Sequence, residues 1–167
     1  MRDREHGRPT GQSFRVNIDG ETTGLKFSAS HFIKGHEQCG YLHGHNYTVR
    51  VEVDGTLDNE GMVIDFFEIE SAIKSLIHDM DHRILIARRH AKIRDKVIAF
   101  DSEDGTVTVP KRSVLILDLD ETTAELIASY LLKRLVLRVK FARSRISRIA
   151  IGVCESDGRT SWSQIEL

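Results

Sequence analysis

Apolar and polar residues alternate along several stretches of this chain, and such alternation predicts β-strands with one buried face. The pattern is clearest in residues 45–53, where Tyr47, Val49 and Val51 alternate with polar residues. Weaker examples occupy residues 13–19, 24–32, 146–155 and 160–166. The sequence DGETTG between the first two of these favours a turn, and we expect the early strands to be connected as hairpins.

Two other segments repeat apolar residues at intervals of three and four, which is typical of amphipathic helices. The first follows Asp65, a good N-cap that has Glu68 three residues later. The second begins near Thr122, with Glu125 in the matching position. The predicted apolar faces are formed by Phe66, Ile69, Ile73, Leu76, Ile77 and Met80 in the first helix and by Ile127, Leu131 and Leu135 in the second.

Residues 83–117 lack a long pattern, but the short runs VIAF, TVTV and VLIL around the turn DSEDG predict a hairpin-like excursion. The order of strands, helices and strands favours an α+β fold with an antiparallel sheet and helices on one face. We expect a single domain over residues 13–167. Residues 1–12 are polar and are expected to be a flexible N-terminus.

Composition narrows the class of protein. The chain has 167 residues, 40% of them hydrophobic, which is enough for one packed core. A net charge of −1 gives no general attraction to nucleic acid or to an acidic membrane surface. No apolar run approaches the length of a membrane span, and the N-terminus lacks an apolar signal core. With only Cys39 and Cys154 as cysteines, we expect a reduced, cytoplasmic protein.

The stretch CGYLHGHNY, residues 39–47, contains the most distinctive chemistry. Residues two apart on a strand point to the same side, so His43 and His45 share a face, and His31 ends an apolar face of its own. Three imidazoles at the ends of neighbouring strands suit Zn²⁺ and usually leave one position open for water or substrate. Two alternatives remain open: ordinary polar residues at strand ends, or a closed structural site with Cys39 as the fourth ligand.

Further candidates are Asp81 beside His82, and Glu155. A carboxylate next to an imidazole can fix its tautomer, although neighbours in sequence do not always touch. Glu155 ends an otherwise apolar strand face and needs a partner, such as a ligand with two N–H donors, or else it simply begins a turn. The basic run from Lys133 to Arg148 is interpreted as a solvated helix flank, with attraction of a polyphosphate as the alternative.

Taken together, these segments resemble the 6-pyruvoyltetrahydropterin synthase / 6-carboxytetrahydropterin synthase family. The resemblance covers residues 24–158 and rests on the ordered set FSASHF, CGYLHGHNYTVRVEV, GMVIDFFEIESAI, MDHRIL, TTAELIA and VCESDG. It implies the tunnelling fold, an antiparallel four-stranded sheet with two helices on one face. It also implies a homo-oligomer, a trimer or a hexamer, with strands joining between subunits into a barrel and active sites between subunits.

The resemblance also implies roles for individual residues. His31, His43 and His45 would bind zinc, and Cys39 would be the catalytic thiol. Asp81 and His82 would form the proton-transfer pair. Glu155 would hold the 2-amino-pyrimidinone edge of a pterin substrate, and Thr123 sits where the family places a hydroxyl near the pterin.

The spacing CxxxHGH resembles the 6-carboxytetrahydropterin synthases of 7-deazaguanine (queuosine and archaeosine precursor) biosynthesis. These enzymes convert 7,8-dihydroneopterin triphosphate to 6-carboxy-5,6,7,8-tetrahydropterin, losing triphosphate and acetaldehyde. The alternatives are a 6-pyruvoyltetrahydropterin synthase and a non-catalytic pterin-binding protein that keeps zinc for stability. Two features depart from the family: an added stretch over residues 87–116, and the lack of a proline in TTAE.

Overall fold

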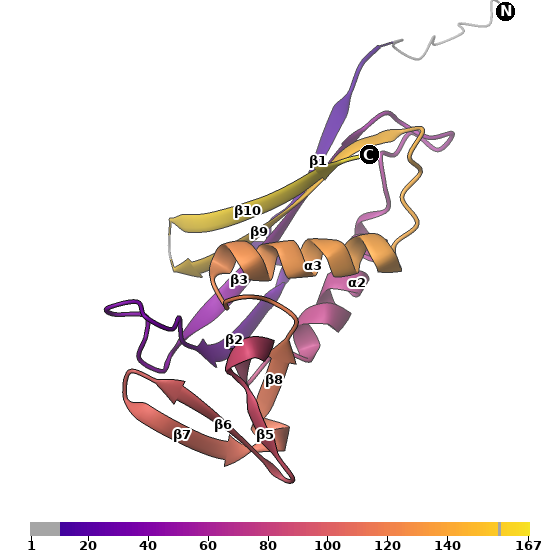
Figure 1. Cartoon of the computed structure of the whole chain (residues 1–167). Coiled ribbons are helices and arrows are strands. Elements are labelled where there is room, and N and C mark those ends of the chain that lie inside the picture. The colour runs from indigo at the N-terminus through magenta and orange to yellow at the C-terminus, as the bar shows by residue number, and fades with distance from the viewer. Residues whose placement is uncertain (1–10, 157) are drawn as a thin grey trace, which may run out of the picture.

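The computed structural model describes residues 11–156 and 158–167. Most of the N-terminal stretch that was expected to be flexible therefore lies outside the described residues. Figure 1 labels most of the helices and strands, which follow one another as β1 (Phe14–Ile18), α1 (Gly20–Thr23), β2 (Lys26–His31), β3 (His43–Gly55), α2 (Phe66–His78), β4 (Arg83–Ala87), η1 (Arg88–His90), β5 (Lys92–Arg94), β6 (Val97–Ser102), β7 (Gly105–Pro110), η2 (Lys111–Ser113), β8 (Val114–Leu117), α3 (Ala124–Arg138), β9 (Ile146–Ser156) and β10 (Arg159–Glu166).

The main sheet is built around β3, the longest of the described strands. The strand order is β10-β9-β3-β2-β4-β8, and β1 pairs with the second half of β3. The expected antiparallel sheet of four strands is present as β10-β9-β3-β2. The sheet then continues through β4 and β8, which run parallel to β2. The sequence pattern did not predict these parallel strands.

The prediction of a hairpin between residues 13–19 and 24–32 is wrong. Both β1 and β2 pair with β3 instead of with each other, because DGETTG forms the one-turn helix α1. Asp19 caps this helix, and Gly24 ends it in the left-handed region with φ 73°. The helix crosses β3 so closely that a Cβ on Gly20 would lie 2.0 Å from the Val49 carbonyl oxygen, so only glycine fits.

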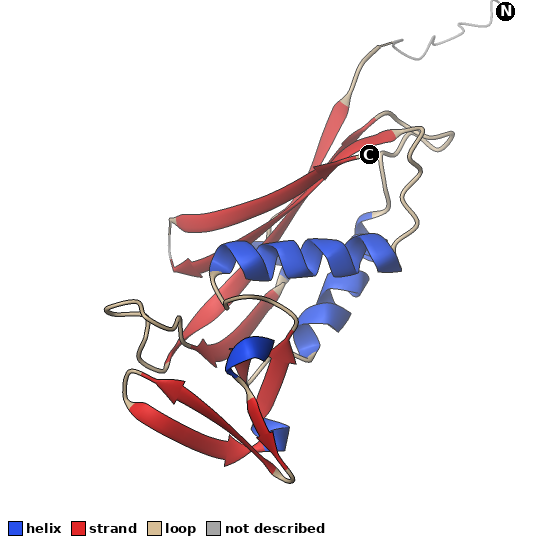
Figure 2. Ribbon diagram, viewed as in Figure 1, coloured by secondary structure: helices blue, strands red, loops and turns tan. Residues whose placement is uncertain are grey.

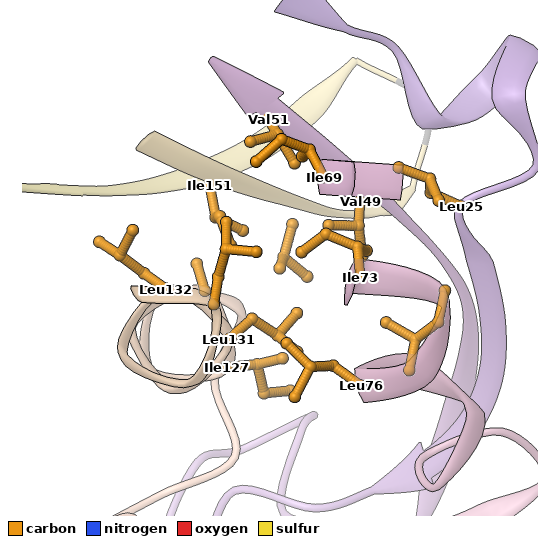
Figure 3. Close-up of a cluster of buried hydrophobic side chains, with 14 of the residues drawn as sticks. Leu25, Val49, Val51, Ile69, Ile73, Leu76, Ile127, Leu131, Leu132 and Ile151 are labelled. Atoms are coloured by element: carbon orange, nitrogen blue, oxygen red, sulfur yellow. The ribbon is translucent and has the colours of Figure 1, made fainter. Parts of the chain in front are cut away.

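The two long helices cover one face of the sheet, as Figures 1 and 2 show. Their apolar residues pack in the main core against Val49, Val51 and Ile151 of the sheet and against Leu25, which directly precedes β2 (Figure 3). Asp65 caps α2 as expected, accepting the Phe67 N–H. Phe66, which was expected on the buried face, is 55% exposed because it lies in the first turn, outside the core.

The N-cap of α3 is Thr123 and not Thr122, the cap that the sequence suggested. Thr123 Oγ1 accepts the Leu126 N–H at 3.4 Å. Thr122 is buried, and its hydroxyl donates to the Phe32 carbonyl at 3.0 Å instead. The one-residue shift thus leaves Thr122 to fasten α3 to the end of β2.

Residues 92–110 of the added stretch form an antiparallel sheet of their own, with order β5-β6-β7, which Figure 1 shows at one end of the molecule. The expected hairpin around DSEDG is present as β6 and β7. This added sheet packs on a second buried cluster formed by Phe32, Ile86, Ile98 and Phe100. In the described part of the chain, no helix is both long and apolar enough to cross a membrane.

Candidate active site

Three histidines converge on one face of the main sheet. In the antiparallel register of β2 and β3, His31 lies opposite His43 and Ala29 lies opposite His45, so all three side chains point to the same side. The ring centroid of His31 lies 4.5 Å from that of His43 and 5.2 Å from that of His45. One nitrogen from each ring falls within 4.8 Å of the others, a spacing that a single metal ion can bridge. The pairing of β2 with β3 therefore builds the cluster that the spacing predicted.

Backbone carbonyls hold two of these rings. His31 Nδ1 lies 2.7 Å from the Thr122 carbonyl oxygen, and His43 Nδ1 lies 2.7 Å from that of Tyr41. A carbonyl can only accept, so each Nδ1 carries a proton, and in the neutral ring Nε2 then presents a lone pair. Histidines that bind a metal through one ring nitrogen usually donate the N–H of the other to such a carbonyl.

Burial keeps His31 neutral. The side chain is 1% exposed, and burial lowers the pKa of His31 to about 4. Its Nε2 is buried and has no hydrogen-bond partner among the described residues. An orphaned, unprotonated nitrogen facing two other imidazoles is costly unless something binds there, and this donor set fits a zinc ion.

Tyr47 and Glu155 border the cluster on its buried side. Tyr47 Oη donates to Glu155 Oε1 at 3.5 Å, and the same carboxylate oxygen lies 3.8 Å from His31 Nε2. Burial raises the pKa of Glu155, and burial followed by the charge of Glu155 raises that of Tyr47 well above its usual range. A half-buried carboxylate beside the cluster gains from any ligand that offers N–H donors.

Cys39 lies outside the cluster of metal-binding atoms among the described residues, because its sulfur does not fall within the 4.8 Å group. It is a free, half-buried cysteine on residues 33–42, the loop between β2 and β3. Its N–H donates to His36 Nδ1 at 3.1 Å, and its carbonyl accepts the Ile33 N–H at 2.6 Å. This arrangement does not favour the alternative of a closed zinc site with sulfur as the fourth ligand.

Asp81 and His82 form a contact pair, although adjacent residues need not do so. Asp81 Oδ2 lies 2.9 Å from His82 Nδ1, and Asp81 Oδ1 accepts the Ser28 N–H at 2.8 Å. The Ser28 N–H and, to a lesser degree, the His82 ring lower the pKa of Asp81. His82 has a positive φ of 57°, an uncommon backbone state for a residue with a side chain and one found at functional sites. Its N–H donates to the Ser28 carbonyl at 2.7 Å, which fixes that state against β2.

A polar cleft of about 440 Å³ runs across β3, β2 and β4. His45 of the cluster and His82 of the pair both border it. Other lining residues offer hydrogen-bonding groups, among them Ser28, Asn46 and Arg83. One residue of the histidine cluster and one residue of the Asp81–His82 pair therefore line the same cleft.

Sequence reasoning missed the groups that orient the site. The Thr122 and Tyr41 carbonyls hold the histidines, but a backbone carbonyl leaves no residue-type signal in a sequence. Tyr47 shares the parity of His43 and His45, which could have indicated its place beside the cluster. Thr123 is found at the start of α3, with its hydroxyl engaged as the N-cap.

Comparison with known proteins settles the family. The family model described as 6-pyruvoyl tetrahydropterin synthase matches residues 22–166. The chain belongs to this family. A member from Haemophilus influenzae named 6-carboxy-5,6,7,8-tetrahydropterin synthase is 36% identical over 120 residues, covering 66% of this chain and 77% of that protein. A Methanocaldococcus jannaschii protein that bears the same name provisionally is 31% identical over 150 residues, covering 86% of this chain and 92% of its own.

Solved structures of the family share the fold. The 6-pyruvoyl tetrahydropterin synthase of Plasmodium falciparum superposes with a TM-score of 0.82 at 26% identity, covering 93% of this chain and 99% of that one. The Plasmodium vivax enzyme, in its E37A catalytic residue mutant, gives 0.84 at 20% identity with the same coverage. The α+β tunnelling fold expected for the family is therefore confirmed for the single chain. Family membership also supports an enzyme of the lyase type.

Proposed function

We propose that this chain is a zinc-dependent carbon–oxygen lyase that converts 7,8-dihydroneopterin triphosphate and water to 6-carboxy-5,6,7,8-tetrahydropterin, with loss of triphosphate and acetaldehyde. The product would enter 7-deazaguanine biosynthesis. The observation that carries the proposal is the cluster of His31, His43 and His45, in which His31 presents an orphaned neutral Nε2. Relatives that bear the name of this activity support the choice of product.

The three histidines would hold the zinc ion through one nitrogen each. Bound zinc supplies Lewis acidity, which makes hydroxyl and carbon-bound protons of the substrate side chain easier to remove. The carbonyls of Thr122 and Tyr41 keep His31 and His43 in the required tautomer. Burial of His31 keeps its ring unprotonated, so proton uptake does not compete with metal binding at neutral pH.

Cys39 would take protons from the substrate side chain, and Asp81 with His82 would relay them. The loop that carries Cys39 leads directly into β3 and hence into His43 and His45. Asp81 holds His82 through Nδ1, which leaves Nε2 free to exchange a proton. Asp81 itself is fixed by the Ser28 N–H, so the pair is oriented before substrate arrives.

Glu155 would bind the 2-amino-pyrimidinone edge of the pterin through two N–H donors. The carboxylate is half-buried, and its one hydrogen bond among the described residues is the long bond from Tyr47. Burial removes water from the Glu155 carboxylate and thereby raises its pKa. Hydrogen bonds from ligand N–H groups would offset the free energy lost with that water. Thr123, at the start of α3, would present its hydroxyl near the pterin.

Assembly into a trimer or hexamer completes the proposal, with active sites between subunits. Strands β10 and β8 end the main sheet in the described part of the chain, so their outer edges are open to pairing. Phe66 and Phe67 are 55% and 79% exposed at the start of α2. Together with Phe14 and Met62 they border an apolar cleft of about 430 Å³, which suits burial against another subunit.

Product analysis tests the reaction. The zinc-loaded protein is incubated with 7,8-dihydroneopterin triphosphate, and the products are identified by mass spectrometry. Release of acetaldehyde with 6-carboxy-5,6,7,8-tetrahydropterin is the expected result. A product that keeps the three-carbon side chain would identify a 6-pyruvoyltetrahydropterin synthase instead, the activity named in the family model.

Replacement of Cys39 separates the enzyme from a non-catalytic, zinc-stabilised pterin-binding protein. We expect Cys39→Ala to keep its zinc and its fold while turnover falls by about 100-fold or more, since the thiol is a base and not a ligand. Zinc content by elemental analysis and acetaldehyde release by a coupled assay measure the two effects. Loss of zinc together with the fold would make Cys39 a ligand and favour the structural role.

A further inference from the structure

The added sheet packs against both ends of the loop that carries Cys39. Phe32 lies between His31 and the start of residues 33–42, and Leu42 ends them directly before His43. Phe32 belongs to the second buried cluster and stacks on Phe100 of β6, with ring centroids 5.1 Å apart. Leu42 packs against the same cluster. The added sheet is therefore joined by its core to the residues next to two of the clustered histidines.

The turn between β6 and β7 contacts the C-terminal end of the same loop. The Glu103 N–H donates to the Gly40 carbonyl at 3.1 Å, and the Asp104 carboxylate accepts the Leu42 N–H at 3.4 Å. Gly40 is buried beside Cys39, although the preceding residues 34–38 are exposed. A Cβ on Gly40 would lie 2.5 Å from the side-chain Cγ of Glu103 and 2.5 Å from the His36 carbonyl oxygen, so the Glu103 side chain packs directly over Gly40. These contacts flank the thiol on its C-terminal side.

Apart from the contacts with the turn, one hydrogen bond among the described residues ties the loop to the main sheet, between the Tyr41 carbonyl and His43 Nδ1 at 2.7 Å. The internal bonds of the loop are few and join Ile33, His36, Cys39 and Gly40 to one another, so they shape the loop without fixing it to the sheet. A loop with an exposed tip opens at low free-energy cost unless tertiary contacts hold it. For a proton-transferring group, displacement by 1 Å costs about 100-fold in rate.

We infer that the β6–β7 turn is a clamp that positions Cys39, with Glu103 and Asp104 as positioning residues. The inference rests on the proposed function, in which Cys39 transfers protons. The clamp acts through the Glu103 N–H and the Asp104 carboxylate. The stacking of Phe100 on Phe32 holds the added sheet, and with it the turn, against the loop. The added stretch thus supports the active site through its contacts with the Cys39 loop.

Glu103→Pro removes the donor N–H with little disturbance of the hairpin. Glu103 has a negative φ and follows a strand residue, a setting that proline tolerates at the start of a turn. Glu103→Ala is the matched variant, since it loses the side chain but keeps the N–H. Asp104→Ala removes the carboxylate, and Asp104→Asn restores an acceptor oxygen. Thr108→Ala, an exposed position on β7, controls for changes in the hairpin itself.

Two measurements decide the inference. The first is the rate of alkylation of Cys39 by iodoacetamide, with buried Cys154 as the internal reference and both peptides quantified by mass spectrometry. The second is kcat, KM and zinc content of the same proteins with 7,8-dihydroneopterin triphosphate. Circular dichroism and thermal melting test whether each variant folds. If Glu103→Pro does not fold, Asp104→Ala is interpreted alone.

We expect faster alkylation in Glu103→Pro than in Glu103→Ala, and faster alkylation in Asp104→Ala than in Asp104→Asn. In the double variant Glu103→Pro, Asp104→Ala, kcat should fall by about tenfold while KM and zinc content stay near wild type, because the thiol moves and the binding groups do not. Unchanged alkylation in both Glu103→Pro and Asp104→Ala overturns the clamp. If the wild-type protein forms no product, the proposed function fails, and alkylation alone then supports or overturns the clamp.

Discussion

His31 illustrates how one residue sets the chemistry of the cluster. It is buried, its Nδ1 is held by the Thr122 carbonyl, and its pKa is lowered to about 4. A protonated ring would be both desolvated and repelled by His43 and His45. The folded protein therefore binds a proton at His31 far less readily than the unfolded chain does.

This difference predicts a pH-dependent stability of the metal-free protein. Between pH 6.5 and pH 4 the unfolded chain is protonated at His31 and the folded chain is not, so stability falls as the pH is lowered. The contribution of His31 to that fall should reach about 3 kcal/mol at the lower limit. Urea denaturation at several pH values, after removal of metal with a chelator, measures it.

His31→Gln is the control, because its amide can still donate to the Thr122 carbonyl but does not titrate. The variant should lose less stability than wild type between pH 6.5 and pH 4. Parallel stability curves for the two proteins would show that His31 is not the group responsible. Carboxylates whose pKa values are lowered, such as Asp54 and Asp81, lose their contribution at lower pH in both proteins alike.

At the scale of elements, α3 links the core to the site through its first residues. Thr122 fastens the helix start to Phe32 and holds His31, while Thr123 caps the helix. The helix buries Ile127, Leu131 and Leu135 against the sheet. Its N-terminus is therefore placed by packing along the whole helix, and the carbonyl that orients His31 is placed with it.

Substitutions of Thr123 should separate capping from substrate binding. Thr123→Ala should lower the free energy of unfolding by about 1 kcal/mol through loss of the cap, and should raise KM if the hydroxyl also contacts the pterin. Thr123→Asp keeps an excellent cap but has no hydroxyl, so we expect it to restore stability and leave KM raised. Chemical denaturation and steady-state kinetics measure the two effects. Recovery of both properties in Thr123→Asp would limit Thr123 to a capping role.

At the scale of the whole molecule, the exposed apolar residues at the start of α2 indicate a contact surface. Phe67 is 79% exposed and Phe66 55%, and both border the apolar cleft near β1. Burial of one phenylalanine side chain stabilises an interface by about 1.5–3 kcal/mol. Such residues on the surface of an isolated chain favour a subunit interface.

The double substitution Phe66→Ser, Phe67→Ser should therefore weaken assembly. We expect the subunit dissociation constant to rise by roughly tenfold or more, with the fold of the single chain retained. Light scattering coupled to size exclusion, over a range of protein concentrations, measures the change. Glu68→Ser, an exposed polar position on the same helix, is the control. An unaltered distribution of oligomers in the double variant would place the interface elsewhere.

The sequence alone determined the elements whose patterns are local. Alternation fixes which face of β3 is buried, and the same parity places His43, His45 and Tyr47 on one side. The spacing of Ile69, Ile73 and Ile77 sets the buried face of α2. These properties follow from backbone geometry within one strand or helix, so they need no knowledge of distant residues.

The tertiary structure decided which strands pair and which distant residues contact the site. Only the packing shows that β1 joins β3 instead of β2, that β4 and β8 are parallel to β2, and that the turn after β6 reaches the Cys39 loop. The same packing supplies the carbonyl of Thr122 to His31. Such contacts join residues far apart in the chain, and their free energy depends on burial and hydrogen bonding across the whole fold. No local pattern encodes that sum, so the histidines could be predicted from the sequence, whereas the groups that orient and support them could not.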